Sequence, residues 1–169
     1  MRSSSSSSSF AYPRAAVAVT IQSLSTTPPA VPHYLLVQRA NPPDLGKWSL
    51  PGGKIEVGEP TLDAAQREIT EETQLQVESC EWLPCPFMTT DSIVKNGNNE
   101  ESVAFHYLIA HCFARAPKGL PLVVPSEDAL DAKWYTLQEI EAMQQDQVSE
   151  LVVKVIERAE ELHTKDALF

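Results

Sequence analysis

The order of apolar and polar segments along the chain predicts an α/β fold, in which a mixed β-sheet is sandwiched between α-helices. Two short apolar, β-branched runs come first, and one clearly patterned helix follows them. Further alternating segments then lead into a second amphipathic helix near the end of the chain. Strands and helices in this order bury their apolar faces when the helices cover a single sheet.

The first two strands are expected at residues 15–21 (AAVAVTI) and 33–39 (HYLLVQR). Both runs are rich in apolar and β-branched side chains, and a Ser/Thr/Pro loop separates them, so they predict a hairpin-like pair. A brief strand is predicted at residues 48–50, and the PGG sequence at residues 51–53 predicts a tight turn after it.

Residues 61–73 carry the clearest helical pattern of the chain. Leu62, Ala65 and Ile69 recur at helical spacing and predict the buried face. Thr61 is a candidate N-cap, because its hydroxyl can accept a hydrogen bond from the first turn.

The second half of the chain returns to strands before it ends in helices. Alternation predicts strands at residues 76–82 and 102–113, with a polar loop between them. Residues 132–135 are a further strand candidate. Thr136 is placed to cap a short helix, and residues 148–162 predict a strongly amphipathic final helix.

Length and composition indicate one globular domain, which we place at residues 14–169. Residues 1–13 are serine-rich and poor in core-forming residues, so we expect a disordered tail. With two arginines and no acid, residues 1–14 also faintly resemble an organelle transit peptide. Three cysteines without a CxxC pair indicate reduced thiols and a cytoplasmic location.

The formal net charge of −10 argues against binding to a nucleic-acid polymer or to an anionic membrane surface. No apolar run approaches the roughly 20 residues that a membrane span requires. A small polyphosphate is still an acceptable partner for an acidic protein, provided that a divalent cation lies between the two sets of negative charge.

Three glutamates of the predicted helix carry the clearest chemical signal. At 3.6 residues per turn, Glu68, Glu71 and Glu72 project from one face. Like charges at this spacing weaken an isolated helix by about 0.2–0.5 kcal/mol per pair, so the cluster suggests a bound cation. Carboxylate oxygens suit Mg²⁺ or Mn²⁺. The alternative is a solvated acidic face with no ligand.

The segment GGKIEVGEPTLDAAQREITEETQL at residues 52–75 contains these glutamates. It resembles the Nudix box, the loop–helix–loop signature of the Nudix hydrolases, at every fixed position except one. The family has glycine where this chain has Gln74. In the family that glycine ends the helix in a left-handed conformation, which glutamine adopts less readily. The resemblance therefore does not decide how the helix ends in this chain. The segments LLVQRA, WSLPGG and KWYTLQEI agree as well, which extends the resemblance from Ala15 to Ile140.

The resemblance implies a Nudix fold and a metal-dependent active site. By similarity, Glu68, Glu71 and Glu72 bind Mg²⁺ (or Mn²⁺), and the Gly52 carbonyl is a further ligand. Metal ions neutralise the oxygens of a pyrophosphate and activate a water for in-line attack. The simpler interpretation of the glycine is that it serves only the turn, and the two roles are compatible.

Two further residues of the box are similar to the family's structural pair. The resemblance implies that Glu59 and Arg67 form this pair and that Arg67 orients a carboxylate through a forked hydrogen bond. The alternative is an ordinary surface ion pair worth less than about 1 kcal/mol.

The general base differs among Nudix enzymes, so several acids remain candidates. Glu71 and Glu72 are two of them, and Glu127, in the PSEDALDAKW loop outside the box, is another. Glu100 and Glu101, in the polar loop before a predicted strand, are further candidates. Arg39 ends a strand that points toward the box in this fold. It is therefore a candidate phosphate contact, with a plain surface arginine as the alternative.

The substrate implied by the resemblance is a small-molecule nucleotide. The stretch leading into the box looks most similar to the ADP-ribose pyrophosphatase-like branch, which suggests ADP-ribose or a similar nucleotide sugar. A MutT-like pyrophosphatase of nucleoside triphosphates, including oxidised nucleotides, is the alternative. A non-catalytic Nudix module that senses a nucleotide is a further hypothesis, and a homodimer is left open. The aromatic residues Trp82, Phe87, Tyr107 and Trp134 are candidates either to stack on a base or to fill the core.

Overall fold

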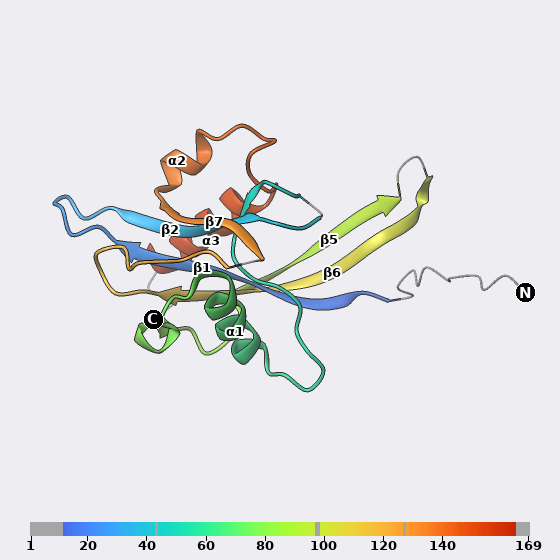
Figure 1. Ribbon diagram of the computed structural model, residues 1–169, viewed down its shortest axis with the longest axis horizontal. Helices are drawn as coiled ribbons and strands as arrows, with labels where there is room; N and C mark the ends of the chain where they lie inside the picture. Colours follow the sequence, from blue (N-terminus) through green and yellow to red (C-terminus); the bar gives the residue numbers. More distant parts are fainter. Residues whose placement is uncertain (1–11, 43, 97–98, 127, 165–169) are drawn as a thin grey trace, which may run out of the picture.

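The structure, a computed structural model, describes residues 12–42, 44–96, 99–126 and 128–164. Within these ranges, one mixed sheet of seven strands has the order β3-β2-β1-β6-β4, with β7 paired to β2 and β5 paired to β6. Figure 1 shows the sheet between α1 on one face and α2 and α3 on the other, as the predicted α/β fold requires. The elements are β1 (Arg14–Leu24), β2 (Pro32–Arg39), β3 (Trp48–Ser49), α1 (Thr61–Thr73), η1 (Val77–Ser79), β4 (Glu81–Trp82), β5 (Met88–Asn96), β6 (Asn99–Arg115), β7 (Ala129–Tyr135), α2 (Leu137–Glu141) and α3 (Val152–Thr164).

Strand β1 lies at the centre of the sheet and packs against both helical layers. It runs antiparallel to β2 and parallel to β6, which confirms the predicted pairing with β2. Val17, Val19 and Ile21 alternate along one face and form a core with Ala65 and Ile69 of α1. These three large side chains favour the observed register, because a shift of one residue would turn them to the opposite face.

The opposite face of the sheet packs against α2 and α3. Tyr34 and Leu36 of β2 are buried there with Ile140 of α2 and with Val155 and Ile156 of α3. Helix α2 begins at the predicted cap: the Thr136 hydroxyl accepts from the Glu139 N–H, and the Glu139 carboxylate accepts from the Thr136 N–H. No helix in the described ranges is long and apolar enough to cross a bilayer.

Two predicted segments differ from the structure. Residues 76–82 form a 3₁₀ turn, η1, followed by the two-residue strand β4. Leu75 and Val77 are buried while Gln76 and Glu78 are exposed. The same alternation therefore arises without an extended strand. The final helix begins at Val152 because the residues before it pair with β3, where the Trp48 N–H donates to the Gln147 carbonyl at 2.8 Å.

Strand β5 was not predicted, because its sequence MTTDSIVKN is mostly polar. Its partner β6 is longer than expected, at 17 residues, and the two form a long antiparallel ribbon. Residues 1–11 of the expected N-terminal tail lie outside the described ranges.

The ends of helix α1 also depart from the expected caps. Pro60 occupies the N-cap position, so Thr61 is the first helical residue and does not cap the helix through its side chain. At the other end, Gln74 adopts the left-handed conformation with φ 53°, and its N–H donates to the Thr70 carbonyl at 3.0 Å. The helix therefore ends where the Nudix box places a glycine.

We expect the Gln74→Gly variant to be more stable than the native chain by about 1 kcal/mol, because a left-handed residue with a Cβ is strained by that order. Urea unfolding measures the difference. The matched control is Gln76→Gly. Gln76 is also exposed but has φ −75°, so glycine there is expected to lower the stability. A loss of stability in both variants would contradict the assignment of strain to Gln74.

His111 of β6 is a buried histidine outside the pocket described below. Its side chain is only 4% exposed, Nε2 lies 2.8 Å from Thr90 Oγ1, and Nδ1 has no hydrogen-bond partner among the described residues. Burial lowers the pKa of His111 to about 4. The folded state therefore binds a proton less readily than the unfolded chain, and stability falls as the pH drops from about 6.5 toward 4.

Between pH 7 and pH 5 this histidine is expected to cost the protein about 2 kcal/mol of unfolding free energy. The His111→Gln variant should lose that part of the pH dependence. Chemical denaturation of both proteins at the two pH values measures the difference. If both proteins lose the same unfolding free energy between pH 7 and pH 5, protonation of His111 does not contribute to the loss.

Candidate active site

Helix α1 directs its three clustered glutamates into one pocket. The pocket has a volume of about 810 Å³ and lies between α1, the loop after β3, the end of β2 and the loop before β7. The opposite side of α1 packs on the sheet through Ala64, Ala65 and Ile69. Lining residues that matter for the chemistry are Arg39, Gly52, Glu68, Glu71, Glu72 and Asp128.

The loop at residues 51–53 is bonded to the edge of β1. The Val19 N–H donates to the Pro51 carbonyl and the Val17 N–H donates to the Gly53 carbonyl, both at 2.8 Å. Between these two bonds, the Gly52 N–H faces α1 and donates to Glu72 Oε2 at 2.9 Å. A Cβ at Gly52 would overlap the Val17 carbonyl oxygen and lie 2.8 Å from the Ala18 Cα. Only glycine lets the loop approach β1 this closely.

Gly53 also has a close neighbour, which is the side chain of Glu68. A Cβ at this position would lie 2.6 Å from Glu68 Oε2. The missing side chain therefore provides the space that the Glu68 carboxylate occupies. The two glycines have different tasks: Gly52 fits against backbone and Gly53 fits against the carboxylate.

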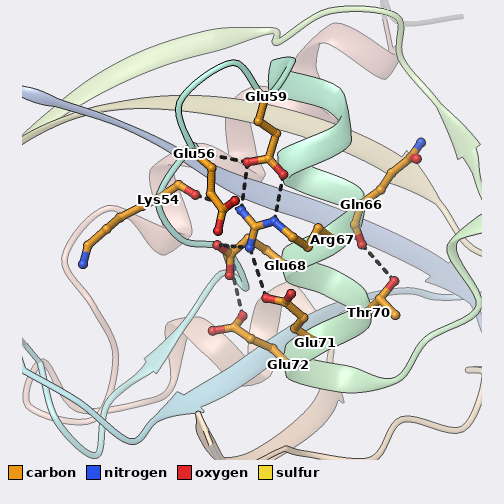
Figure 2. A network of polar contacts seen from close by, with 10 residues as sticks. Lys54, Glu56, Glu59, Gln66, Arg67, Glu68, Thr70, Glu71 and Glu72 are labelled. Carbon is orange, nitrogen blue, oxygen red and sulfur yellow. Dashed lines mark hydrogen bonds and ion pairs between the residues drawn. The ribbon is translucent and has the colours of Figure 1, made fainter.

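Arg67 is the hub of the site, and its guanidinium lies among the carboxylates (Figure 2). It contacts Glu59 bidentately, with Nε donating at 2.7 Å and Nη2 at 3.0 Å. Nη1 donates to Glu68 at 2.9 Å and to Glu71 at 3.0 Å, and Nη2 also donates to the Lys54 carbonyl at 3.0 Å. All five guanidinium donors are thereby used. Arg67 is fixed as a support for the glutamates and has no donor left for another ligand.

The pKa values of Glu59 and Arg67 reflect the hydrogen bonds that the Arg67 guanidinium makes. Hydrogen bonds from Arg67, and then from the Glu56 N–H, lower the pKa of Glu59 to about 2. The bond to Glu59 raises the pKa of Arg67. Both groups are charged at neutral pH, as a forked ion pair requires.

Two of the clustered glutamates are less well neutralised. Burial raises the pKa of Glu72 to about 7, and the hydrogen bond from Gly52 opposes this only in part. Burial also raises the pKa of Glu68, against the lowering effect of Arg67. A positive charge in addition to that of Arg67 would stabilise the charged form of these desolvated carboxylates.

The donors fit a divalent cation. Glu68, Glu71 and Glu72 offer hard carboxylate oxygens, and Glu68 and Glu72 are partly desolvated in a like-charged cluster. Within the described ranges, no three acidic, histidine or cysteine side chains already converge as a metal cluster. The Arg67 Nη1 group bridges Glu68 and Glu71 instead.

The structure also places the predicted residues outside helix α1. Arg39 lines the pocket at the end of β2, and its charge acts on Glu72. Glu127 lies outside the described residues. Its neighbour Asp128 lines the pocket and was missed from the sequence, although it belongs to the same acidic loop. This loop is held to the C-terminal end of α1, where the Ser126 N–H donates to the Glu72 carbonyl at 3.2 Å.

The four aromatic candidates do not line the pocket. Trp82 and Trp134 pack on the α1 core, and their indole N–H groups donate to backbone carbonyls. Phe87 packs on the opposite face with Phe113, and Tyr107 stacks on Phe105 of the same strand. The pocket wall formed by the described residues contains no aromatic side chain.

The fold and the pocket together define an α/β protein with an acidic pocket whose carboxylate oxygens suit a divalent cation. The family model of the NUDIX domain matches residues 12–156, and the chain therefore belongs to the Nudix family. Putative nudix hydrolase 1 of Caenorhabditis elegans is 29% identical over 110 residues, which is 65% of this chain and 26% of that relative. Putative 8-oxo-dGTP diphosphatase 2 of Mycobacterium tuberculosis is 50% identical over 44 residues, which is 25% of this chain and 31% of that relative. The matched segments thus span about a quarter to a third of these curated relatives.

Solved structures share the fold over almost the whole chain. The Nudix hydrolase RenU of M. smegmatis superposes with a TM-score of 0.68 at 18% identity, covering 92% of this chain and 89% of that one. The NUDIX domain of Shewanella oneidensis NrtR, solved with ADP ribose, superposes with a TM-score of 0.63 at 22% identity, covering 90% and 89%. The predicted Nudix fold is confirmed.

Proposed function

We propose that this protein is a Nudix hydrolase that uses Mg²⁺ or Mn²⁺ to cleave the pyrophosphate bond of a nucleoside-diphosphate-linked substrate. The observation that carries the proposal is that Glu68, Glu71 and Glu72 line one pocket, where Arg67 holds the first two carboxylates and the Gly52 N–H donates to the third. Phosphates cannot enter such an acidic pocket without a cation, because like charges repel.

In this proposal each side chain has a distinct task. Glu68, Glu71 and Glu72, with the Gly52 carbonyl, would hold the metal, which polarises the phosphate and activates water when bound. Glu71, Glu72 and Glu127 are the candidates to take the proton of the attacking water.

The supporting residues act on the glutamates and on the phosphates. The Glu59–Arg67 pair keeps the carboxylates of Glu68 and Glu71 in place. Arg39 faces the phosphates from the end of β2.

ADP-ribose, or a similar nucleotide sugar, is our first candidate substrate. The NrtR domain with ADP ribose in its structure supports this choice. The relative named as an 8-oxo-dGTP diphosphatase favours a second candidate, a pyrophosphatase of nucleoside triphosphates. Both candidates need the same carboxylates, because a pyrophosphate linkage is cleaved in each substrate.

A substrate screen with Mg²⁺, with Mn²⁺ and with chelator tests the proposal. AMP released from ADP-ribose, and abolished by chelator, is the expected result. Pyrophosphate released from a nucleoside triphosphate would keep the hydrolase and select the second candidate. Nucleotide binding without turnover in either metal would reject the enzyme and favour a non-catalytic sensing module.

A further inference from the structure

The β5–β6 ribbon extends beyond the rest of the sheet (Figure 1). Pairing of β6 with β1 starts at Tyr107, opposite Arg14, so residues 99–106 of β6 pair only with β5 in the part of the chain that is described. The outer edge of β5 has no strand beside it in those ranges. A two-stranded ribbon is marginally stable alone, and a free edge offers its backbone groups to another strand.

One face of this ribbon carries three exposed apolar side chains. Ile93 is 52% exposed, Val103 is 42% exposed and Leu108 is 47% exposed. The register places all three on the same face, because Val103 lies opposite Lys95 and Leu108 lies opposite Asp91. Asp91, Ile93 and Lys95 are alternate residues of β5 and share that face.

The charges of β5 are self-complementary about Ile93. Asp91 lies two residues before it and Lys95 two residues after it. If a second β5 lies antiparallel with Ile93 opposite Ile93, each Asp91 faces the Lys95 of the other copy. Opposite charges directly across from each other stabilise strand pairing. An antiparallel ladder accepts this register whether the two Ile93 residues form a hydrogen-bonded pair or a non-hydrogen-bonded pair.

The side chains needed for this contact are accessible. Lys95 is exposed and has no acidic partner among the side chains that the structure describes. Asp91 is 59% exposed, and its contact with His106 at 2.9 Å engages Oδ1, so that Oδ2 can accept from a lysine. From this geometry we propose that a second copy of the chain binds along β5, giving a twofold-symmetric dimer whose axis passes through Ile93.

Sedimentation of the full chain over a range of protein concentrations tests the proposal. The native chain is expected to dimerise. Lys95→Asp should weaken the dimer about tenfold or more, because two attractive pairs become repulsive. The double variant Asp91→Lys/Lys95→Asp exchanges both charges and should restore the dimer. Lys118→Asp makes the same charge change on an exposed loop away from the ribbon and should leave dimerisation unchanged.

A second measurement locates the axis directly. An Ile93→Cys variant is expected to give a disulfide-linked dimer on mild oxidation, and the native chain under the same oxidation is its control. A native chain that stays monomeric, a dimer unaffected by Lys95→Asp, or a double variant that stays dissociated would overturn the proposal. These outcomes are independent of catalysis, because the ribbon contributes no residue to the pocket.

Discussion

Replacing Glu72 by glutamine is expected to lower kcat by about 10²–10⁴-fold with the fold retained, and Glu71→Gln is expected to do the same. Glutamine keeps an oxygen that can accept from the Gly52 N–H or from Arg67, so the local hydrogen bonds survive. It removes the charge that a metal or a proton needs. Steady-state rates with Mg²⁺ at a saturating substrate concentration measure the effect.

The control for this pair is Asp63→Asn. Asp63 lies in the first turn of the same helix and does not line the pocket. Removing its charge should change stability by less than about 1 kcal/mol and leave kcat unchanged. Near-native rates in both the Glu71 and Glu72 variants would reject the proposed metal site.

Gly52→Ala is expected to destabilise the protein by at least about 3 kcal/mol. The new Cβ would overlap the Val17 carbonyl oxygen and press on the Ala18 Cα, and both neighbours are backbone of the central strand. Neither can move without breaking the bonds that hold the loop to β1. Thermal and urea unfolding measure the loss.

Gly53→Ala is the matched substitution at the next residue. The three atoms nearest to its Cβ all belong to the carboxylate of Glu68, which can rotate away. We therefore expect a folded protein with a stability near that of the native chain, but with weaker Mg²⁺ dependence and lower kcat. If Gly53→Ala unfolds the protein while Gly52→Ala leaves it stable, the roles that the structure gives to the two glycines are wrong.

The predicted elements are those whose sequence pattern reports burial directly. Strands β1 and β2 were predicted from their apolar, β-branched runs, and both are largely buried; helix α1 was predicted from its one apolar face. Strand β5 was missed because residues 89, 91, 93 and 95 are exposed and residues 88, 90, 92 and 94 are only half-buried. Residues 76–82 show the opposite case: Val77 is buried between the exposed Gln76 and Glu78 in a 3₁₀ turn, so a short alternation arises without an extended strand.

By itself, the sequence determined that three glutamates share one helical face, because a 3.6-residue repeat leaves no other arrangement. It also determined the family, through the spacing of residues 52–75. The left-handed end of α1 at Gln74 was not determined in this way, because intrinsic preference disfavours it and the contacts around the helix end decide the matter.

Only the tertiary structure decided what surrounds the glutamates. Bonding of residues 51–53 to β1 brings the Gly52 N–H to Glu72, and the loop held to the end of α1 adds Asp128 to the pocket. The saturation of Arg67 depends on Lys54 and Glu59, which lie outside the helix. These contacts join segments distant in sequence, and their energies come from burial and geometry that no local pattern encodes.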